Sequence, residues 1–230
     1  MRLLGDVVAW FTDPASWSGD DGIWNRLLEH SLLTAGALAI AVLVGLPIAL
    51  WLGHRRRGGT VLVNLANVGR AVPIVALLSL LALGWVGSGD FGPFGRAGLA
   101  TLITLALFAL PPIVSSTHLG ISTVDDGLVE AARAMGMTER EVLAKVELPL
   151  ARPLIVSGLR LAVVQVWATA TVAALVAGPG LGRIITHGYD ADRPSEIIGA
   201  SIVVAVIALV LELLLAVAQR VSDPVPAEPR

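Results

Sequence analysis

Residues 130–136 read Glu-Ala-Ala-Arg-Ala-Met-Gly, and residues 146–149 read Val-Glu-Leu-Pro. This charged, helix-forming stretch stands between long apolar segments of the chain. The whole sequence of 230 residues is 55% hydrophobic and 15% charged, with a mean hydropathy of +0.79. In soluble proteins about a quarter of the residues are charged. The composition therefore predicts an integral membrane protein in which the charged stretch is a loop between spans.

The first part of this loop predicts a short helix. Asp125 or Asp126 can cap it, because an acidic side chain accepts hydrogen bonds from the first backbone N–H groups and suits the positive end of the helix dipole. The helix would include Glu130 and end at Gly136.

The second part predicts another short helix. Thr138 and Glu141 have the spacing of a capping box, which opens a helix, and Leu148-Pro149 would end it. We expect the small and aliphatic side chains of this helix pair to be covered by something outside the loop. The alternative is a hairpin packed on its own membrane domain. The side chains in question are Ala131, Ala132, Ala134, Met135, Val142, Leu143 and Val146.

Apolar segments long enough to cross a bilayer, about 20 helical residues, predict an all-α protein of about five spans. Pro111-Pro112, near the end of the third span, are predicted to break or kink that helix. Trp10, Trp17 and Trp24 recur every seven residues before the first span, but Pro14 and Gly19 argue against one continuous helix through them, and an interfacial aromatic belt is expected. The five predicted spans are residues 31–52, a segment within 61–86, 97–117, about 154–176 and 197–219.

Basic residues predict the orientation of the spans. Three consecutive arginines follow the first span at 55–57, and the positive-inside rule places this loop in the cytoplasm. The amino terminus is then outside and the carboxyl terminus inside, with nine Lys and Arg residues on inner segments against five on outer ones. The predicted parts are an external or interfacial segment 1–30, a transmembrane domain 31–220 with an inner loop at about 118–153, and a cytoplasmic tail 221–230.

Several kinds of site are excluded by composition. The chain has no cysteine, so disulfides and thiolate metal sites are absent. Its four histidines show no metal-ligand spacing, and its net charge of -2 gives no basic field for nucleic acid. No phosphate-binding loop surrounds the only lysine, Lys145. The glycine-rich residues 178–182 follow a membrane span rather than a strand, so a tight external turn is expected there.

The loop matches the docking signature of ABC importer permeases: Glu-Ala-Ala, three residues, Gly, nine residues, an aliphatic residue, one more, then Leu-Pro. Residues 71–78 and 109–114 resemble the second and third spans of that family. Residues 124–138, 169–176 and 180–182 resemble the osmoprotectant permeases in particular. The resemblance covers roughly residues 32–220. One departure is Arg70, where many relatives carry a neutral polar residue.

This resemblance implies a type I importer permease that moves glycine betaine, choline, carnitine or a similar solute into the cytoplasm by alternating access. It implies partner ATPase subunits that bind ATP and Mg²⁺, a second permease subunit (a copy or a paralogue) and an extracytoplasmic substrate-binding protein. The chain itself would hold no cofactor and catalyse no reaction. The residues implied to dock the ATPase are Glu130, Ala131, Ala132, Gly136, Val146, Leu148 and Pro149.

Polar residues inside predicted spans are candidates for the translocation pathway. Arg70 is one, because a charge in hydrocarbon is costly and usually faces a cavity or a partner. Gln165 and Thr169 lie four residues apart and share a helix face, so they are further candidates. Their alternative role is hydrogen bonding to a neighbouring helix or to their own backbone. For Arg160 and Glu212, a position near the inner interface is the expected explanation.

Three other functions are compatible with parts of the sequence. A permease for another small solute, such as an amino acid carried by a methionine-type importer, is the first alternative. A membrane anchor or receptor that transports nothing is the second. An intramembrane hydrolase using Ser157 and His187 is the third, and the predicted topology argues against it because these residues lie at opposite ends of the fourth span.

Overall fold

The computed structural model describes residues 2–56, 59, 61, 64, 68–69, 71–87, 89, 91–95 and 97–222, and over these residues the chain is built from helices and turns. In chain order the elements are α1 (Arg2–Thr12), α2 (Pro14–Trp17), α3 (Ile23–His54), α5 (Ile74–Leu83), η1 (Trp85–Gly87), η2 (Gly92–Phe94), α6 (Gly98–Ser122), α7 (Asp126–Ala134), α8 (Glu139–Val142), η3 (Leu143–Glu147), α9 (Leu148–Thr169), η4 (Ala170–Val176), α10 (Gly182–Asp190) and α11 (Pro194–Ser222).

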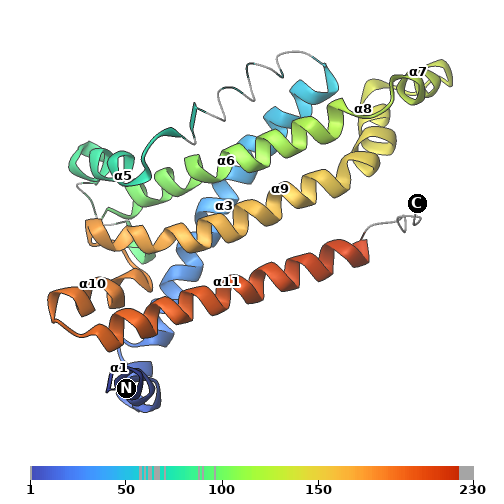
Figure 1. The fold of residues 1–230 in the computed structure, drawn as a ribbon. Coiled ribbons are helices and arrows are strands. Elements are labelled where there is room, and N and C mark those ends of the chain that lie inside the picture. The colour runs from blue at the N-terminus through green and yellow to red at the C-terminus, as the bar shows by residue number, and fades with distance from the viewer. Residues whose placement is uncertain are drawn as a thin grey trace.

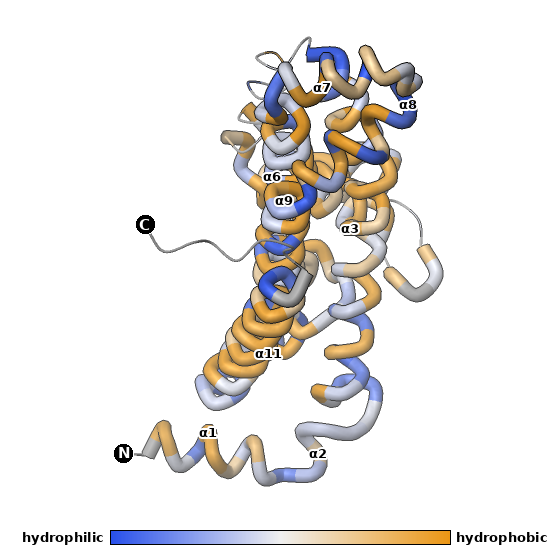
Figure 2. Tube along the Cα trace, turned by 90° about the vertical axis from the view of Figure 1, so that its right-hand side faces the viewer, coloured by the Kyte–Doolittle hydropathy of each residue, from blue (hydrophilic) through white to orange (hydrophobic). Residues whose placement is uncertain are grey.

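Four helical stretches within the described residues are long and apolar enough to cross a membrane: α3, α6, the run containing α9, and α11. They confirm the predicted first, third, fourth and fifth spans. The second predicted span, 61–86, lies partly outside the described residues, and its later half contains α5 with ten residues. The long helices lie side by side in Figure 1, and their tubes are mainly hydrophobic in Figure 2.

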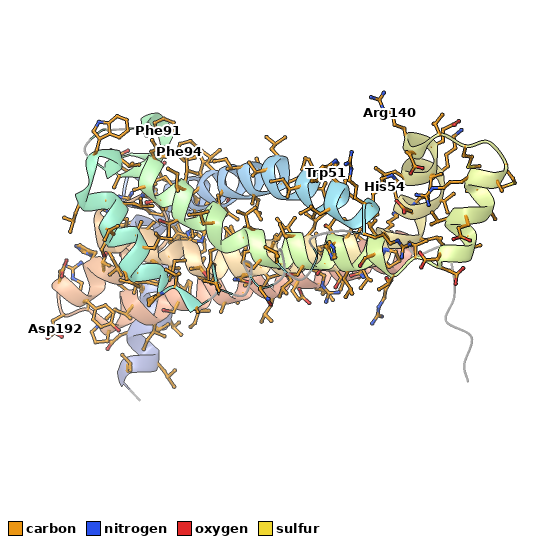
Figure 3. All side chains as sticks on the ribbon, turned by 90° about the horizontal axis from the view of Figure 1, so that it is seen from above. Trp51, His54, Phe91, Phe94, Arg140 and Asp192 are labelled. Atoms are coloured by element: carbon orange, nitrogen blue, oxygen red, sulfur yellow. The ribbon has the colours of Figure 1, made fainter. Side chains whose placement is uncertain are left out.

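The bundle has two distinct ends. α7 and α8 project at one end, beside the last turn of α3, and we call this the hairpin end (Figure 1). α1, α10 and the beginning of α3 lie at the other, which we call the opposite end. Figure 3 places His54 and Arg140 at the hairpin end, and Phe91, Phe94 and Asp192 at the opposite end.

The core between α3, α6 and α9 is made largely of small side chains. Ala37 and Ala41 on α3, Ala109 on α6 and Ala162 on α9 are completely buried there. Gly158 on α9 extends this close packing, because a Cβ added to it would lie 2.5 Å from Ser116 Cβ on α6. Small residues let helix backbones approach closely, which is how helices gain packing energy in lipid.

The prolines in α6 do not break it. The helix continues from Gly98 through Pro111 and Pro112 to Ser122, so of the predicted break or kink the break is wrong. A proline removes one backbone N–H and thereby one hydrogen bond to the carbonyl four residues earlier. Both proline side chains are buried between helices, where neighbouring elements can compensate for that loss.

The tryptophan repeat at the amino end is divided among three helices, which confirms that no single helix runs through it. Trp10 lies on α1, Trp17 on α2 and Trp24 on α3. The indole Nε1 of Trp17 donates to the carbonyl of Phe11 at 2.7 Å, and its ring lies 5.3 Å from that of Trp24. α1 is held against α11, where a Cβ at Gly199 would lie 2.3 Å from the Trp10 ring.

Replacing Gly158 with alanine tests the close packing of α6 and α9. The new methyl group would meet Ser116 Cβ at 2.5 Å and the Pro112 carbonyl oxygen at 2.7 Å, neither of which is a flexible side-chain end. We expect a loss of about 1–3 kcal/mol in stability, measured by thermal unfolding of the detergent-solubilised protein.

The matched control is Gly5→Ala on α1, where a Cβ meets no atom within 4 Å. This change should leave the unfolding temperature the same or slightly higher, because alanine favours helix. Equal unfolding temperatures for the two variants would contradict the packing assigned to Gly158.

Candidate functional site

The charged loop folds as the helical hairpin that its sequence predicted, beginning with α7. The Asp125 side chain caps this helix by accepting the Leu128 N–H at 3.1 Å. At its end the Gly136 N–H donates to the Arg133 carbonyl, and the next residue's N–H donates to the carbonyl of Ala132. This pair of bonds is a Schellman motif. Gly136 has φ +87°, a conformation that glycine adopts without strain, so the prediction that it stops the helix is confirmed.

The capping box that opens α8 is also confirmed. Thr138 Oγ1 accepts the Glu141 N–H at 3.4 Å, and Glu141 Oε2 accepts the Thr138 N–H at 3.0 Å. Lys145 Nζ donates to the other oxygen of Glu141 at 2.8 Å. These bonds satisfy backbone donors that the helix start would otherwise leave unpaired.

The hairpin has a small hydrophobic core of its own. Val124, Val129, Ala132 and Val142 are buried together, and Val146 packs against them. The expectation that the loop could not bury its apolar side chains is therefore wrong for Ala132, Val142 and Val146. A Schellman turn folds α7 back against α8, so that each helix covers part of the other.

The second helix does not end at Leu148-Pro149, which corrects that prediction. α8 passes through the π-helical turn η3 directly into α9. The Leu148 N–H donates to the Leu143 carbonyl, five residues earlier instead of four. Because Pro149 has no N–H to offer, this change of hydrogen-bond register lets the helix continue past it. The hairpin is thus joined to a membrane span without a break.

The predicted docking residues separate into exposed and covered ones. Two apolar side chains outside the predicted set, Leu128 on α7 and Met135 at its C-cap, are also exposed, by 51% and 73%. Ala132 is only 2% exposed and faces the hairpin core. Exposed members of the predicted set are Glu130, Ala131, Gly136 and Pro149, half-buried members are Val146 and Leu148, and Ala132 is buried.

Two of the predicted pathway residues, Gln165 and Thr169, lie near the end of α9 that is far from the hairpin. Arg70 is outside the described residues. Gln165 Nε2 reaches the carbonyl of Phe108 at 3.5 Å, a long hydrogen bond to the group that Pro112 leaves without its helical donor. Thr169 Oγ1 donates to the Gln165 carbonyl at 2.7 Å. Both side chains thus make the backbone contacts that were named as the alternative to lining a pathway.

Arg160 and Glu212 are paired with each other across α9 and α11. The Arg160 guanidinium donates to the Glu212 carboxylate and, at 3.3 Å, to Gln219 Oε1. Gln219 Nε2 in turn donates to the Pro153 carbonyl at 3.4 Å. Pairing with an opposite charge reduces the cost of both charges in an apolar segment.

The sequence did not point to the contact between the hairpin and α3. His54, the last residue of α3, lies between the carboxylates of Glu147 and Glu139. These residues are far apart in the chain and form no known motif. The signal that could have drawn attention to them is a charged residue, Glu147, among the apolar positions of the docking signature.

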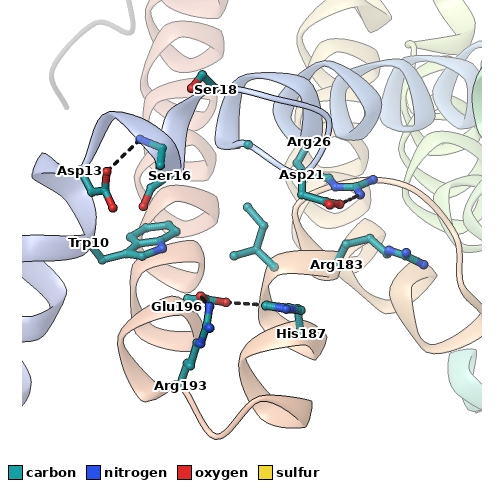
Figure 4. A pocket seen from close by; sticks show the side chains of 13 residues that line it. Trp10, Asp13, Ser16, Ser18, Asp21, Arg26, Arg183, His187, Arg193 and Glu196 are labelled. Atoms are coloured by element: carbon teal, nitrogen blue, oxygen red, sulfur yellow. Dashed lines mark hydrogen bonds and ion pairs between the residues drawn. The ribbon is translucent and has the colours of Figure 1, made fainter.

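A cavity of about 610 Å³ lies at the opposite end of the bundle (Figure 4). The guanidinium of Arg26 binds Asp21 and lowers the pKa of that carboxyl. Glu196 accepts from His187 at 2.7 Å and from Arg193 at 2.9 Å. Among the described residues no group of three His, Asp or Glu side chains is arranged to hold a metal ion.

The family of binding-protein-dependent transport system inner membrane components matches residues 22–225. The chain belongs to this family. Its members are membrane-spanning permease subunits and are not themselves catalytic. The long apolar helices of this permease agree with a multi-pass protein of the inner membrane.

The permease is similar to three characterised relatives over most of its length. It is 31% identical to the choline transport system permease protein OpuBB of Bacillus subtilis over 86% of this chain and 88% of that protein. It is 31% identical to OpuBD, another choline permease of the same organism, over 98% and 94% of the two chains. It is 32% identical to the carnitine transport permease OpuCD of Listeria monocytogenes over 88% and 87%.

Solved structures of the MetNI methionine ABC transporter in inward-facing conformations contain chains with the same fold as this permease. One has a TM-score of 0.71 and 21% sequence identity over 85% of this chain and 93% of that chain. Another has a TM-score of 0.68 and 22% identity over 92% and 97%. The predicted fold class, a type I ABC importer permease, is therefore confirmed.

Replacing Gly136 tests the turn on which the hairpin depends. Gly136→Ala should weaken protection of the α7 amides in hydrogen exchange by about 1–2 kcal/mol, because alanine is strained at positive φ. Gly136→Asn should cost less, since asparagine tolerates this conformation. No atom lies within 4 Å of an added Cβ, so steric overlap does not contribute. Equal effects of Ala and Asn would contradict the role assigned to φ.

Proposed function

We propose that this permease is the membrane-spanning subunit of an ATP-driven importer for a compatible solute such as glycine betaine, choline or carnitine. The observation that carries the proposal is the similarity to permeases named for choline and carnitine, at 31–32% identity over most of each chain. A further relative, 28% identical over 85% of this chain, is named for glycine betaine, carnitine and choline together. These solutes share a quaternary ammonium group.

The proposed docking surface for the ATPase is the exposed face of α7. Leu128, Ala131 and Met135 lie three and seven residues apart, which puts them on one side of the helix. The opposite side already packs on the hairpin core. An apolar helix face that its own chain leaves uncovered is suited to a groove in a partner. ATP and Mg²⁺ would be bound by that partner.

In the proposed orientation the hairpin end is cytoplasmic and the opposite end faces outward. Arg55, Arg133 and Arg140 lie at or near the hairpin end, as the positive-inside rule requires. The substrate-binding protein would then meet the end that carries α1 and α10, and the tail 221–230 would be cytoplasmic. The second permease subunit would be a copy of this chain or a paralogue.

The unbroken connection from α8 through η3 to α9 supports a mechanism for alternating access. When the ATPase subunits close on ATP, they would move the docked hairpin. Helix backbone runs from Glu139 to Val176, so a displacement of the hairpin reaches a membrane span without passing through a flexible loop. Tilting of the spans would open the pathway outward, and hydrolysis would return it to the inward-facing state.

An amino-acid importer is the second candidate. The structural neighbours belong to a methionine transporter. At sequence identities of 21% and 22% this similarity establishes a shared fold and does not identify the substrate. The relatives that are more similar in sequence are named for quaternary ammonium solutes instead. We therefore favour the osmoprotectant class.

Introducing a charge on α7 tests the docking surface. Ala131→Glu should weaken binding of the ATPase subunit by at least about tenfold, measured by titration in detergent, because it buries an unpaired carboxylate in the interface. Ala131 is exposed in the free chain, so the unfolding temperature should not change. Ala191→Glu, at an exposed position of the opposite end, is the matched control and should bind normally. Equal binding by both variants would reject this surface.

Uptake into proteoliposomes tests the transport proposal. The permease is reconstituted with its cognate ATPase and binding protein, and ATP-dependent accumulation of labelled glycine betaine is measured against unlabelled choline, carnitine, proline and methionine. We expect accumulation that quaternary ammonium competitors block. Methionine competition alone would favour the amino-acid alternative. ATP hydrolysis without accumulation of labelled glycine betaine would reject this solute as the substrate and favour the amino-acid alternative.

A further inference from the structure

The hairpin is joined to the membrane bundle differently at its two ends. At its exit, helix backbone continues from α8 through η3 into α9 (Figure 1). At its entry, α6 ends at Ser122 and α7 begins at Asp126, so residues 123–125 form a turn between the two helices. A turn bends more easily than a helix, because fewer of its backbone groups are hydrogen-bonded to one another. The entry is therefore the point at which α7 could shift without moving the rest of the bundle.

The side chain of Arg56, which follows the last turn of α3, spans this turn. Its Nη1 donates to the Ser122 carbonyl at 2.9 Å, and its Nη2 donates to the Val124 carbonyl at 2.6 Å. Nη1 also lies 2.9 Å from Oδ1 of Asp126, the first residue of α7. One guanidinium from the end of the first span thus contacts the end of α6, the turn and the beginning of α7.

The two carbonyls are groups that a helix end and a turn leave in need of donors. The last carbonyls of a helix have no donor within it, and a cation beside them is favoured by the helix dipole. The side chain of Val124 is buried in the hairpin core, so a bond to its carbonyl holds that core as well as the turn. The ion pair with Asp126 adds little, because this carboxylate is 75% exposed.

The backbone of Arg56 adopts a conformation that is unfavourable for arginine. Its φ is +49°, in the left-handed region, where a Cβ crowds the backbone. Its N–H donates to the Gly53 carbonyl at 3.0 Å, so this conformation ends α3. Glycine is the usual residue in such a helix-ending position. An arginine where glycine would be unstrained points to a role for its side chain.

The end of α3 and the hairpin are separated by an open cavity of about 870 Å³, which is lined by residues of α3, α7, α8 and η3. Closely packed side chains transmit a displacement from one helix to the next, and a cavity does not. Arg56 crosses this gap at the entry of the hairpin. His54 crosses it at the exit, where its Nδ1 lies 2.5 Å from Glu147 Oε2. At the entry, the guanidinium contacts therefore take the place of close packing.

We propose that Arg56 is a positioning residue that ties the docking helix α7 to the first span, so that movement of the ATPase reaches α3 as well as α9. The proposal rests on the proposed function, in which α7 receives that movement. With the Arg56 side chain in place, α7 moves together with the ends of α3 and α6. Without it, the turn at 123–125 bends, α7 shifts by itself, and less solute is transported for each ATP hydrolysed.

The experiment measures solute transported per ATP hydrolysed in proteoliposomes that contain the permease, its cognate ATPase and the binding protein. Labelled glycine betaine is the solute, and only the hydrolysis that the binding protein stimulates is counted. Arg56→Gln should lower this ratio roughly threefold to tenfold, the size of effect that single residues have on coupling. A variant that merely folds less well loses transport and stimulated hydrolysis together, which leaves the ratio unchanged.

Two further variants separate the contacts of the guanidinium from its charge. Arg55→Gln is the matched control, because it removes the same charge one residue earlier, where the guanidinium lies 4.8 Å from the centre of the Trp51 ring. It should keep the wild-type ratio. Arg56→Lys keeps the charge and lacks the planar fork that reaches two carbonyls, so its ratio should be nearly as low as that of Arg56→Gln. A wild-type ratio in Arg56→Lys, or equally low ratios in Arg55→Gln and Arg56→Gln, would overturn the proposal.

Hydrogen exchange gives a readout that needs no transported solute. The N–H groups of Leu128 and Val129 bond to the side chain and the carbonyl of Asp125, at the end of the turn. With the ATPase bound, both amides should exchange about tenfold faster in Arg56→Gln than in the wild type or Arg55→Gln, because hydrogen bonds from a charged donor no longer hold the turn.

The two measurements distinguish failure of this proposal from failure of the proposed substrate. Unchanged exchange in Arg56→Gln would show that its side chain does not hold the turn. Faster exchange with an unchanged ratio would reject its role in coupling. Wild-type proteoliposomes that accumulate no betaine would reject the proposed substrate, and the exchange result would still decide whether Arg56 ties α7 to the first span.

Discussion

Hydrocarbon offers the polypeptide backbone no hydrogen-bonding partner, and the architecture of this permease follows from that constraint. The backbone hydrogen bonds of the long helices are made within each helix. The hydroxyls of Thr101 and Thr104 also donate hydrogen bonds to backbone carbonyls four residues earlier, at 3.0 and 2.8 Å. At two prolines another group or a change of register compensates for the missing donor. Gln165 reaches the carbonyl that Pro112 leaves free, and η3 changes its register before Pro149. These two prolines therefore change the hydrogen-bond pairing locally, and the helices continue past them.

The parts of the structure that the sequence predicted well are those decided by neighbouring residues. A capping box, a helix-ending glycine and a run of apolar residues each act over a few positions, so they identified four of the five predicted spans and both starts of the hairpin helices. The predicted ends of the helices differ from the observed ones. α3 begins at Ile23 and α6 continues to Ser122, beyond the predicted spans, because a helix can extend past the hydrocarbon once its next turns find packing partners.

The features that the sequence did not predict depend on contacts between distant residues. Ala132 and Val142 are buried by each other's helices, which the isolated pattern of each helix does not reveal. The continuation of the chain through Leu148-Pro149 depends on the register change in η3. The contact of His54 with Glu147 joins the end of one span to the beginning of another. The two residues are far apart in the sequence, so the spacing of charged residues does not predict that they meet. Candidate docking residues could be named because the loop resembles a known signature, whereas their division into exposed and buried ones required the fold.

α11 differs from the other spans in how it is held. Much of its apolar surface is uncovered within the chain, with Leu209 68% and Leu213 64% exposed. Apolar side chains slide past one another with little change in energy, so they define the height of a helix poorly. The ion pair between Arg160 and Glu212 supplies that definition, because a shift of one helical turn, about 5.4 Å, would separate the two charges. A displacement of α11 along its axis is therefore passed on to α9, the span that leaves the hairpin.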